Sequence, residues 1–352
     1  MKYVPALDGL RAVAVVAVVS SHSGHVPGFG GGFMGVDMFF VLSGYLITTI
    51  LTGENDKHGR VDVVGFYLRR FFRLVPALLF MLAAYLAVAG YVWPRYSAAE
   101  HYRDAAVTLA FLSDYFAAFT LRPAYLLQTW SLAVEEHFYL LWPWLLLWAL
   151  PRGHALKFMA AACLVAMEWR ALNFWYFPWD FAYFRFDSRL DGLLLGSVLS
   201  LAIRDYPKLL QVRLSPIVPH LALGLILLQF AAGAWYGRVT GTVGITVTEL
   251  LTAVLIYYFV ARAAQGEASS SVLEWRPVRW LGVMSYGIYL WHYPISKVTR
   301  EALPVGWSFA VCLGLATLMA WISWHSVERL GRLGRDRVAS LRAPRAGDSS
   351  AA

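Results

Sequence analysis

Apolar stretches long enough to form membrane-spanning helices recur along this chain from one end to the other. A helix that crosses a bilayer needs about 20 predominantly apolar residues. Eleven windows approach this requirement, at 8–26, 33–52, 74–93, 104–120, 137–150, 155–172, 189–204, 216–235, 245–263, 280–297 and 307–327. The pattern therefore predicts an all-α fold, a polytopic bundle of transmembrane helices.

Basic residues between the windows indicate which loops face the cytoplasm, where Lys and Arg accumulate. The segment 54–73 contains five of them, and the tail after residue 327 is rich in arginine. The loop 23–31 carries no charge apart from that of a possible histidinium. We therefore expect both termini on the cytoplasmic side, in a bacterial cytoplasmic (inner) membrane.

Two cytoplasmic termini require an even number of crossings, so one of the eleven windows should not span. The weakest is 104–120, which Asp104, Ser113 and Asp114 interrupt. We expect it to be re-entrant or to lie at the outer surface, which leaves about ten spans. Such a segment is tolerated at membrane depth only where protein or a water-filled cavity covers it, so we expect a cavity near residues 104–137.

Composition supports a membrane protein. Hydrophobic residues make up 59% of the 352 residues and charged residues only 15%, against about 25% charged in soluble domains. The net charge of +8 would suggest nucleic-acid binding in a soluble protein, but here the topology of the loops explains it. We expect a membrane domain at 1–330 and a polar, basic cytoplasmic tail at 331–352 that is disordered. The two cysteines lie in apolar runs, and no metal or disulfide pattern is present.

The first window carries ionisable residues, which are costly inside a membrane and therefore suggest a function. Arg11 and His22 are eleven residues apart, which places them on one helix face about 16 Å apart along the axis. Asp8 and His25 extend the same stripe. One explanation is that Arg11 merely extends to the lipid headgroups and that His22 is merely a packing residue. Alternatively, His22 is a general base or acyl acceptor and Arg11 binds a donor phosphate.

The second and third windows add charged residues at their ends. Asp37 could cap its helix or pair with a basic group, and Ser43-Gly44 would allow a close helix approach. Arg69, Arg70 and Arg73 could anchor the third span at the cytoplasmic surface or hold the phosphates of an acyl-CoA. These two roles of the arginines are compatible.

The stretch 128–143 contains two adjacent carboxylates at the entrance to a span. In a helix, Glu135 and Tyr139 share a face, whereas Glu136 points elsewhere. A surface helix can carry such a pair without a function. At this position, an acid is better explained as a proton acceptor or as a group that orients a histidine, and His137 is a further titratable neighbour.

Two later stretches combine charged or hydroxyl-bearing residues with the start of a span. Arg189 and Asp191 belong to an alternating charged segment, which could be a solvated collar or an acceptor site for carbohydrate hydroxyls. Ser285, Tyr289 and His292 follow one helix face at offsets of four and three. Packing alone is the alternative explanation for this second group.

Six motifs now stand in order along the chain. They are D-G-L-R with R-x10-H (8–22), G-V-D-x-F-F-V-L-S-G-Y (35–45), R-R-x-x-R-x-x-P (69–76), W-S-L-x-V-E-x-x-F-Y (130–139), R-x-D-G-L-L-x-G (189–196) and S-Y-x-I-Y-L-x-H-x-P (285–294). Together they make the chain resemble the acyltransferase 3 family of integral membrane acyltransferases, from about residue 4 to 328.

The resemblance implies transfer of an acyl group, commonly acetyl, from cytoplasmic acyl-CoA to a hydroxyl. The acceptor would be an envelope glycan, a lipid-linked sugar or a secondary metabolite such as a macrolide sugar. Arg11 and His22 match the paired functional residues of the family, and Glu135 rather than Glu136 matches its acid. His137 stands where many relatives have Gln. The extracytoplasmic hydrolase-like domain of some relatives is expected to be absent, so a second transfer step would need another protein or not occur.

The resulting hypothesis is a membrane O-acyltransferase without a metal. Its expected site residues are His22, Glu135 and Arg11 for catalysis, Arg11, Arg69, Arg70 and Arg73 for acyl-CoA, and Asp37, Arg189, Asp191, Tyr139 and His292 for the acceptor. A transporter or flippase of an acylated lipid or small molecule is the alternative, because intramembrane charges suit it too. No internal repeat supports that alternative.

Overall fold

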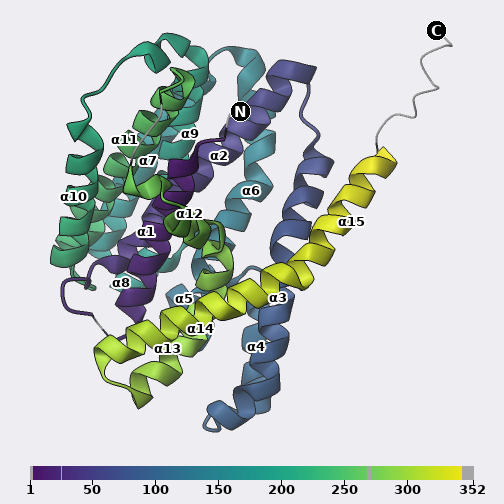
Figure 1. The fold of residues 1–352 in the computed structure, drawn as a ribbon, viewed down its shortest axis with the longest axis vertical. Helices are drawn as coiled ribbons and strands as arrows, with labels where there is room; N and C mark the ends of the chain where they lie inside the picture. Colours follow the sequence, from purple (N-terminus) through teal and green to yellow (C-terminus); the bar gives the residue numbers. More distant parts are fainter. Residues whose placement is uncertain (1–2, 25, 268–270, 343–352) are drawn as a thin grey trace.

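A computed structural model describes residues 3–24, 26–267 and 271–342, with side chains up to residue 336. Every regular element within these ranges is helical (Figure 1). The longer helices are α1 (Pro5–His22), α2 (Gly35–His58), α3 (Val63–Val92), α6 (Thr129–Ala149), α7 (Ala155–Tyr176), α9 (Leu190–Asp205), α10 (Ile217–Ala232), α11 (Ile245–Ala264), α13 (Ser285–Ala302), α14 (Val305–His325) and α15 (Val327–Arg342).

Shorter helices connect these elements. They are α4 (Ala98–Leu109), α5 (Ser113–Thr120), α8 (Trp179–Phe184) and α12 (Arg276–Val283), the 3₁₀ turns η1 (Gly32–Met34), η2 (Leu150–Arg152), η3 (Phe186–Ser188), η4 (Pro207–Gln211) and η6 (Val272–Glu274), and the π-helical turn η5 (Thr240–Gly244).

The window at 104–120 does not form one helix. It contains the end of α4, a break at Phe111, where φ is +55°, and then α5. The 12 residues of α4 extend about 18 Å, which is less than the roughly 30 Å of a bilayer core. Neither α4 nor α5 is therefore long enough to cross a membrane.

The chain is an integral membrane protein. Within the described residues, four helical stretches are individually long and apolar enough to span a bilayer, at Gly32–His58, Val63–Val92, Thr240–Ala264 and Val305–Asp336. Several other long helices carry ionisable residues that lower their hydropathy, as Asp8 and Arg11 do in α1. The total of ten spans stays a prediction.

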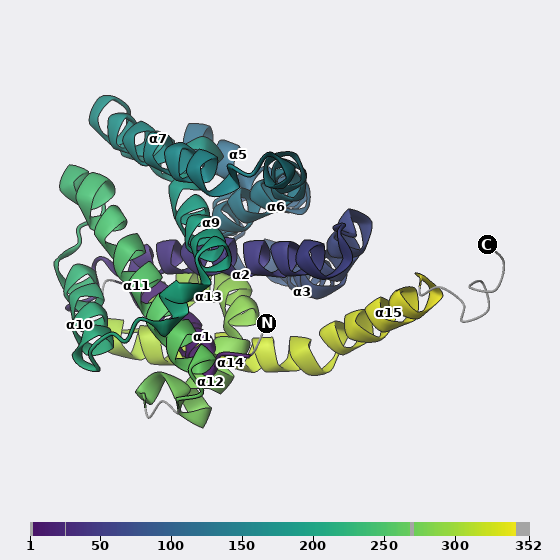
Figure 2. The same ribbon diagram turned by 90° about the horizontal axis from the view of Figure 1, so that it is seen from above.

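Helix α2 runs through the middle of the bundle, with α9 on one side and α1 and α13 on the other (Figure 2). Glycines allow its close approach to α9. A Cβ at Gly44 would lie 1.9 Å from the Leu193 carbonyl oxygen, and one at Gly196 would lie 2.0 Å from that of Val41. The close helix approach expected from Ser43-Gly44 is thus confirmed.

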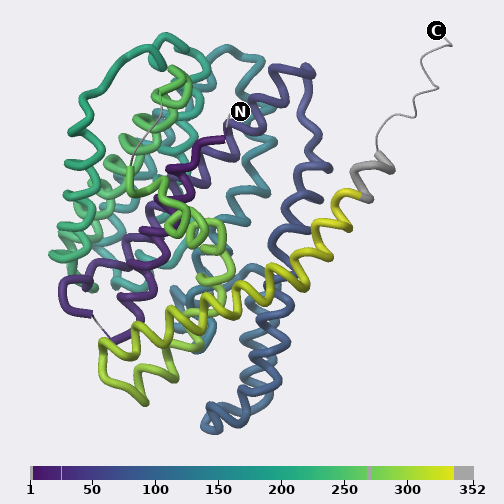
Figure 3. Tube along the Cα trace, viewed as in Figure 1, coloured from purple at the N-terminus to yellow at the C-terminus, as the bar shows by residue number. Residues whose placement is uncertain are grey.

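The beginning of the tail, which the sequence suggested would be disordered, forms helix α15 as far as Arg342. Helix α15 follows α14 and passes α3 (Figure 3). Gly331 and Gly334 bring it close to Phe72 of α3, since a Cβ at Gly331 would lie 2.5 Å from the Phe72 carbonyl oxygen. This packing against α3 stabilises helix α15, although its many arginines suggested a solvated tail. Residues 343–352 lie outside the described ranges.

Candidate active site

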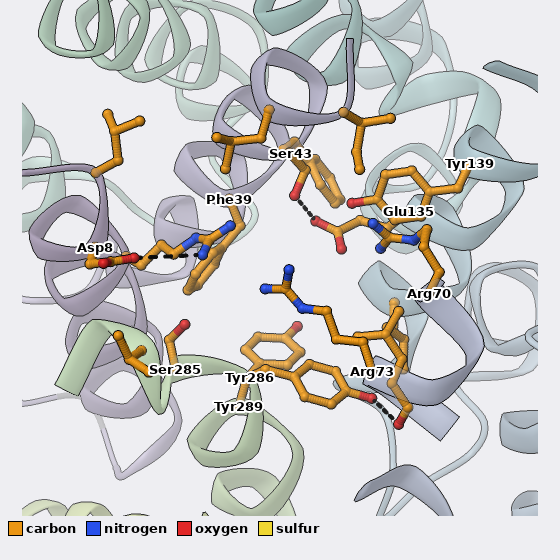
Figure 4. A pocket seen from close by; sticks show the side chains of 18 of the residues that line it. Asp8, Phe39, Ser43, Arg70, Arg73, Glu135, Tyr139, Ser285, Tyr286 and Tyr289 are labelled. Carbon is orange, nitrogen blue, oxygen red and sulfur yellow. Dashed lines mark hydrogen bonds and ion pairs between the residues drawn. The ribbon is translucent and has the colours of Figure 1, made fainter. Parts of the chain in front are cut away.

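A cavity of about 480 Å³ lies between α1, α2, α3, α6 and α13 (Figure 4). Helical spacing directs its polar side chains inward, because residues three or four apart share a face. Its lining residues are Tyr3, Val4, Leu7, Asp8, Arg11, Val36, Phe39, Phe40, Ser43, Leu46, Ile47, Ile50, Arg70, Arg73, Leu74, Ser131, Leu132, Glu135, Tyr139, Val283, Ser285, Tyr286 and Tyr289. We call this space the arginine cavity.

Two of the three arginines in this cavity have acidic neighbours. Arg11 Nη1 lies 3.8 Å from Asp8 Oδ1, one turn earlier in α1. Arg70 Nη2 lies 3.4 Å from Glu136 Oε1. The Arg70 guanidinium also sits over the Tyr139 ring, 3.3 Å from the ring centroid. Both side chains are therefore held in place by contacts within the protein.

Arg73 differs from the other two. Its guanidinium extends from α3 into the cavity (Figure 4) and forms no hydrogen bond or ion pair with any described residue. A planar guanidinium with all its donors available is suited to bidentate binding of phosphate or carboxylate. The cavity therefore offers a binding position for an anion at Arg73.

Glu135 lies beside Arg70 on the cavity wall, across from Asp8, as Figure 4 shows. Ser43 Oγ of α2 donates a hydrogen bond of 2.7 Å to Glu135 Oε1. Tyr139, one turn later in α6, also lines the cavity, whereas Glu136 turns to Arg70 and does not. The predicted division between the two adjacent glutamates is confirmed.

Arg69 lies outside the cavity, although it belongs to the same basic run. Its side chain is 46% exposed, and its Nη2 lies 3.4 Å from Glu54 Oε2. The run 69–73 is thus divided, because Arg69 turns to Glu54 of α2 while Arg70 and Arg73 face the cavity. Of its three arginines, the structure brings Arg70 and Arg73 to the cavity.

His22 lies at the other end of α1 and pairs with His292 of α13. The two facing atoms, His22 Nδ1 and His292 Nε2, are 3.3 Å apart, and the ring centroids are 5.1 Å apart. Neither histidine lines the cavity, and Glu135 hydrogen-bonds Ser43 rather than His22. His25, the last member of the expected stripe, lies outside the described residues.

One residue links the histidine pair to the cavity. Tyr289 lines the cavity with its side chain, and its carbonyl oxygen accepts a hydrogen bond of 2.6 Å from His292 Nδ1. Its hydroxyl lies 2.6 Å from Ser131 Oγ and donates to the Gln128 carbonyl at 3.0 Å. The cavity and the histidine pair are therefore neighbouring sites separated by one layer of side chains.

Three of the residues expected to bind the acceptor belong to a separate buried group. Arg189 donates to Asp37, and Arg170 Nε donates to Asp191 Oδ2 at 2.6 Å. Glu249 Oε2 lies 3.9 Å from Arg170 Nη2. All five residues are at most 1% exposed. We call them the sealed cluster.

The sealed cluster gives no access to an acceptor. The rings of Trp130, Tyr183 and Phe40 surround the Arg189 guanidinium, with centroids 5.8, 4.7 and 5.9 Å from its central carbon. The geometry therefore does not place Asp37, Arg189 and Asp191 at a binding surface. Of the two roles that the sequence suggested for Asp37, the structure shows the pairing with a basic group and not the capping of α2.

Residues 4–325 match the Acyl_transf_3 family model, which is described as an acyltransferase domain. The chain belongs to the acyltransferase 3 family. An acyltransferase domain thus accounts for nearly all of its described helices, including those that form the arginine cavity.

This acyltransferase 3 chain is also similar to proteins named as O-acetyltransferases. It is 33% identical to the peptidoglycan O-acetyltransferase OatA of Listeria monocytogenes, over 93% of this chain and 55% of that protein. It is 32% identical to the O-acetyltransferase OatA of Staphylococcus aureus, over 93% of this chain and 57% of that protein. The chain spans a little over half the length of these relatives. No solved structure matches it.

The structure adds residues to the site of this acyltransferase 3 chain that the sequence did not single out. Ser131 and Phe39 line the cavity, and Arg170 and Glu249 complete the sealed cluster. The sequence marked Arg170 and Glu249 as unusual, because each is an ionisable residue inside an apolar window. The signal for Ser131 was only its place in the motif at 130–139, because a serine in a span is otherwise ordinary. The cavity expected near residues 104–137 reaches only 131–135 of that range.

Proposed function

We propose that this protein is a membrane O-acyltransferase that moves an acetyl group from acetyl-CoA to a hydroxyl of an envelope carbohydrate. The observation that carries the proposal is Arg73, a cation without an acidic partner in the arginine cavity of an acyltransferase domain. A cavity with three arginines and two carboxylates on its walls has an excess of positive charge. It therefore favours an anionic ligand, and acyl-CoA carries several phosphates.

The separation between the cavity and His22 suits the shape of this donor. In acyl-CoA, the thioester is at the end of a long pantetheine arm, far from the phosphates. Arg11 and His22 belong to one helix and are separated by about 16 Å along its axis. We place the phosphates at Arg11 and Arg73, on the expected cytoplasmic side, and the thioester toward His22, past Tyr289.

His22 is the proposed base or acyl carrier. In direct transfer, the acceptor hydroxyl gives its proton to His22, its oxygen attacks the thioester carbon, and the C–S bond breaks. The departing thiolate then takes the proton from His22. In the two-step alternative, His22 receives the acyl group while CoA leaves as a thiolate. The acceptor hydroxyl then attacks this acyl group, which releases neutral His22, and the hydroxyl proton goes to the thiolate. Glu135 faces the cavity and not His22, so its proposed role is to accept hydrogen bonds from the bound donor.

The acceptor follows from the relatives and from the position of His22. The relative in Listeria monocytogenes is named for peptidoglycan O-acetylation, and we extend a carbohydrate acceptor to this chain. His22 is half-buried and precedes the loop 23–31, which we expect on the outer side. An envelope glycan or lipid-linked sugar would reach His22 from there.

Labelled acetyl-CoA tests the proposal. Purified protein in proteoliposomes, with envelope glycan fragments outside and acetyl-labelled CoA inside, should attach label to the glycan. His22→Ala should fold but transfer no label, while His58→Ala, which changes an exposed histidine at the end of α2, should transfer it normally. Wild-type transfer by His22→Ala would refute the role of His22. Passage of an acylated molecule across the membrane without covalent transfer would instead favour a transporter.

A further inference from the structure

The partner of His22 is itself held in one orientation. His292 is fully buried, and its Nδ1 faces the Tyr289 carbonyl oxygen at 2.6 Å. The carbonyl of His292 lies 3.3 Å from Cys312 Sγ of α14, which ties this turn of α13 to its neighbour. The His292 ring is thus oriented by its Nδ1 contact with Tyr289, with Nε2 directed at His22.

These contacts determine which nitrogens carry protons. A carbonyl oxygen only accepts, so His292 Nδ1 must carry the hydrogen that it donates to Tyr289. No described carboxylate lies within ion-pair distance of His292, and a buried charge without a partner is unfavourable. His292 is therefore neutral, and its Nε2 carries a lone pair that faces His22.

The same logic applies to His22. Its Nδ1 lies 2.9 Å from the Val18 carbonyl oxygen and 3.3 Å from His292 Nε2. Both of these atoms are acceptors, so His22 Nδ1 carries a hydrogen. In neutral His22 the lone pair then belongs to Nε2, which becomes the atom that can take a proton or an acyl group.

We propose that His292 is a positioning residue for His22, and not part of the acceptor site. The inference rests on the proposed function, because it assigns the reactive atom of the same catalytic histidine. Val18 and His292 together hold the Nδ1 hydrogen and keep the ring in place. When Nε2 takes the proton of the acceptor hydroxyl, His22 becomes an imidazolium, and His292 Nε2 accepts a stronger hydrogen bond from it.

A second histidine suits this position better than a carboxylate. An aspartate without a cationic partner would place a charge in a fully buried site at every stage of the reaction. Neutral His292 introduces no charge while His22 is neutral, and its Nε2 accepts a stronger hydrogen bond only when His22 becomes charged. The Tyr293 ring, whose edge packs on His22 at a centroid distance of 5.1 Å, completes the support.

Two substitutions of His292 separate hydrogen bonding from packing. His292→Phe fills the space without an acceptor, and we expect kcat to fall about 10- to 100-fold, the loss that follows when the hydrogen-bond partner of a metal-bound histidine is removed. The KM for acetyl-CoA should stay within about twofold, because the donor phosphates bind elsewhere. His292→Gln restores an acceptor oxygen and should recover most of kcat. His220→Gln, which changes an exposed histidine of α10 outside the site, should match the wild type.

Nitrogen NMR of histidine side chains tests the protonation states without relying on turnover. In wild-type protein, with His22→Gln and His292→Gln for assignment, both histidines should carry hydrogen on Nδ1. A hydrogen on His22 Nε2, or a His292→Phe variant with wild-type kcat, would overturn the inference and leave the proposed function intact. Wild-type protein that transfers no label from acetyl-CoA would overturn the proposed function instead, whatever the NMR result.

Discussion

The arginine cavity and the sealed cluster contain the same kinds of residue on two sides of α2. In the sealed cluster, Arg170 and Arg189 each reach a carboxylate, and the five members are at most 1% exposed. In the cavity, Arg73 forms no ion pair with any described residue and faces open space. Ionisable residues inside a membrane domain are therefore not equivalent, since pairing and burial decide which of them can meet a ligand.

One aromatic residue forms the boundary between the two regions. Phe40 lines the cavity, and its ring centroid lies 5.9 Å from the central guanidinium carbon of Arg189. Ser43, one turn later in α2, faces the cavity, whereas Asp37, about one turn earlier, faces the cluster. A single helix thus supplies both sites, and the direction of each side chain assigns it to one of them.

The largest effect is expected from breaking the sealed cluster. Arg170→Leu leaves Asp191 and Glu249 buried without their cationic neighbour, and breaking a buried pair typically costs about 3–5 kcal/mol. We expect the free energy of unfolding in detergent to fall by about this amount. Denaturant titration followed by tryptophan fluorescence would measure it.

Arg69→Gln is the matched control for this measurement, because Arg69 is 46% exposed and forms only a surface pair with Glu54. Surface pairs contribute about 0–1 kcal/mol. If Arg170→Leu unfolded at the same denaturant concentration as Arg69→Gln, the cluster would have no structural role. The contrast between a structural cluster and a binding cavity would then fail.

The sequence predicted the positions of the helices better than the contacts between them. Hydropathy windows indicated the long helices, because burial in a bilayer requires long apolar runs, and helical spacing placed Glu135 and Tyr139 on one face. Neither property indicates which helices touch. The contacts Asp37–Arg189 and His22–His292 join residues more than 150 positions apart, so they emerged only with the packing of the bundle. For the same reason, the sequence could suggest that the acid at position 135 orients a histidine but could not reveal that it bonds Ser43.

An intermediate effect is expected in the cavity itself. Arg73→Gln removes the unpaired cation, and a hydrogen bond to a charged group contributes about 1.5–3 kcal/mol, which corresponds to a roughly 10- to 100-fold higher KM for acetyl-CoA. Stability should not fall, because Arg73 has no ion pair to lose. Steady-state kinetics with acetyl-CoA would show the change, and Arg69→Gln should change KM less than about twofold.

A shortened donor sharpens this result. Acetyl-pantetheine has the thioester but no phosphates, so wild type and Arg73→Gln should use it with similar KM values. A difference that persisted with acetyl-pantetheine would show that Arg73 does not act on the phosphates. In that case the cavity would bind another part of the donor.

The smallest effect is expected for Ser43→Ala, which tests the boundary at α2. The substitution removes one hydrogen bond, the 2.7 Å contact with Glu135, and a typical bond contributes about 0.5–1.5 kcal/mol. We expect the KM for acetyl-CoA to rise about 2- to 10-fold, because Glu135 would lose its fixed orientation on the cavity wall. Ser200→Ala is the control, since Ser200 is buried between α9 and α2 outside the cavity, where it bonds Thr49. Equal KM values for the two variants would show that the donor does not contact Glu135. Among the charged residues of the cavity, donor binding would then be limited to the arginines.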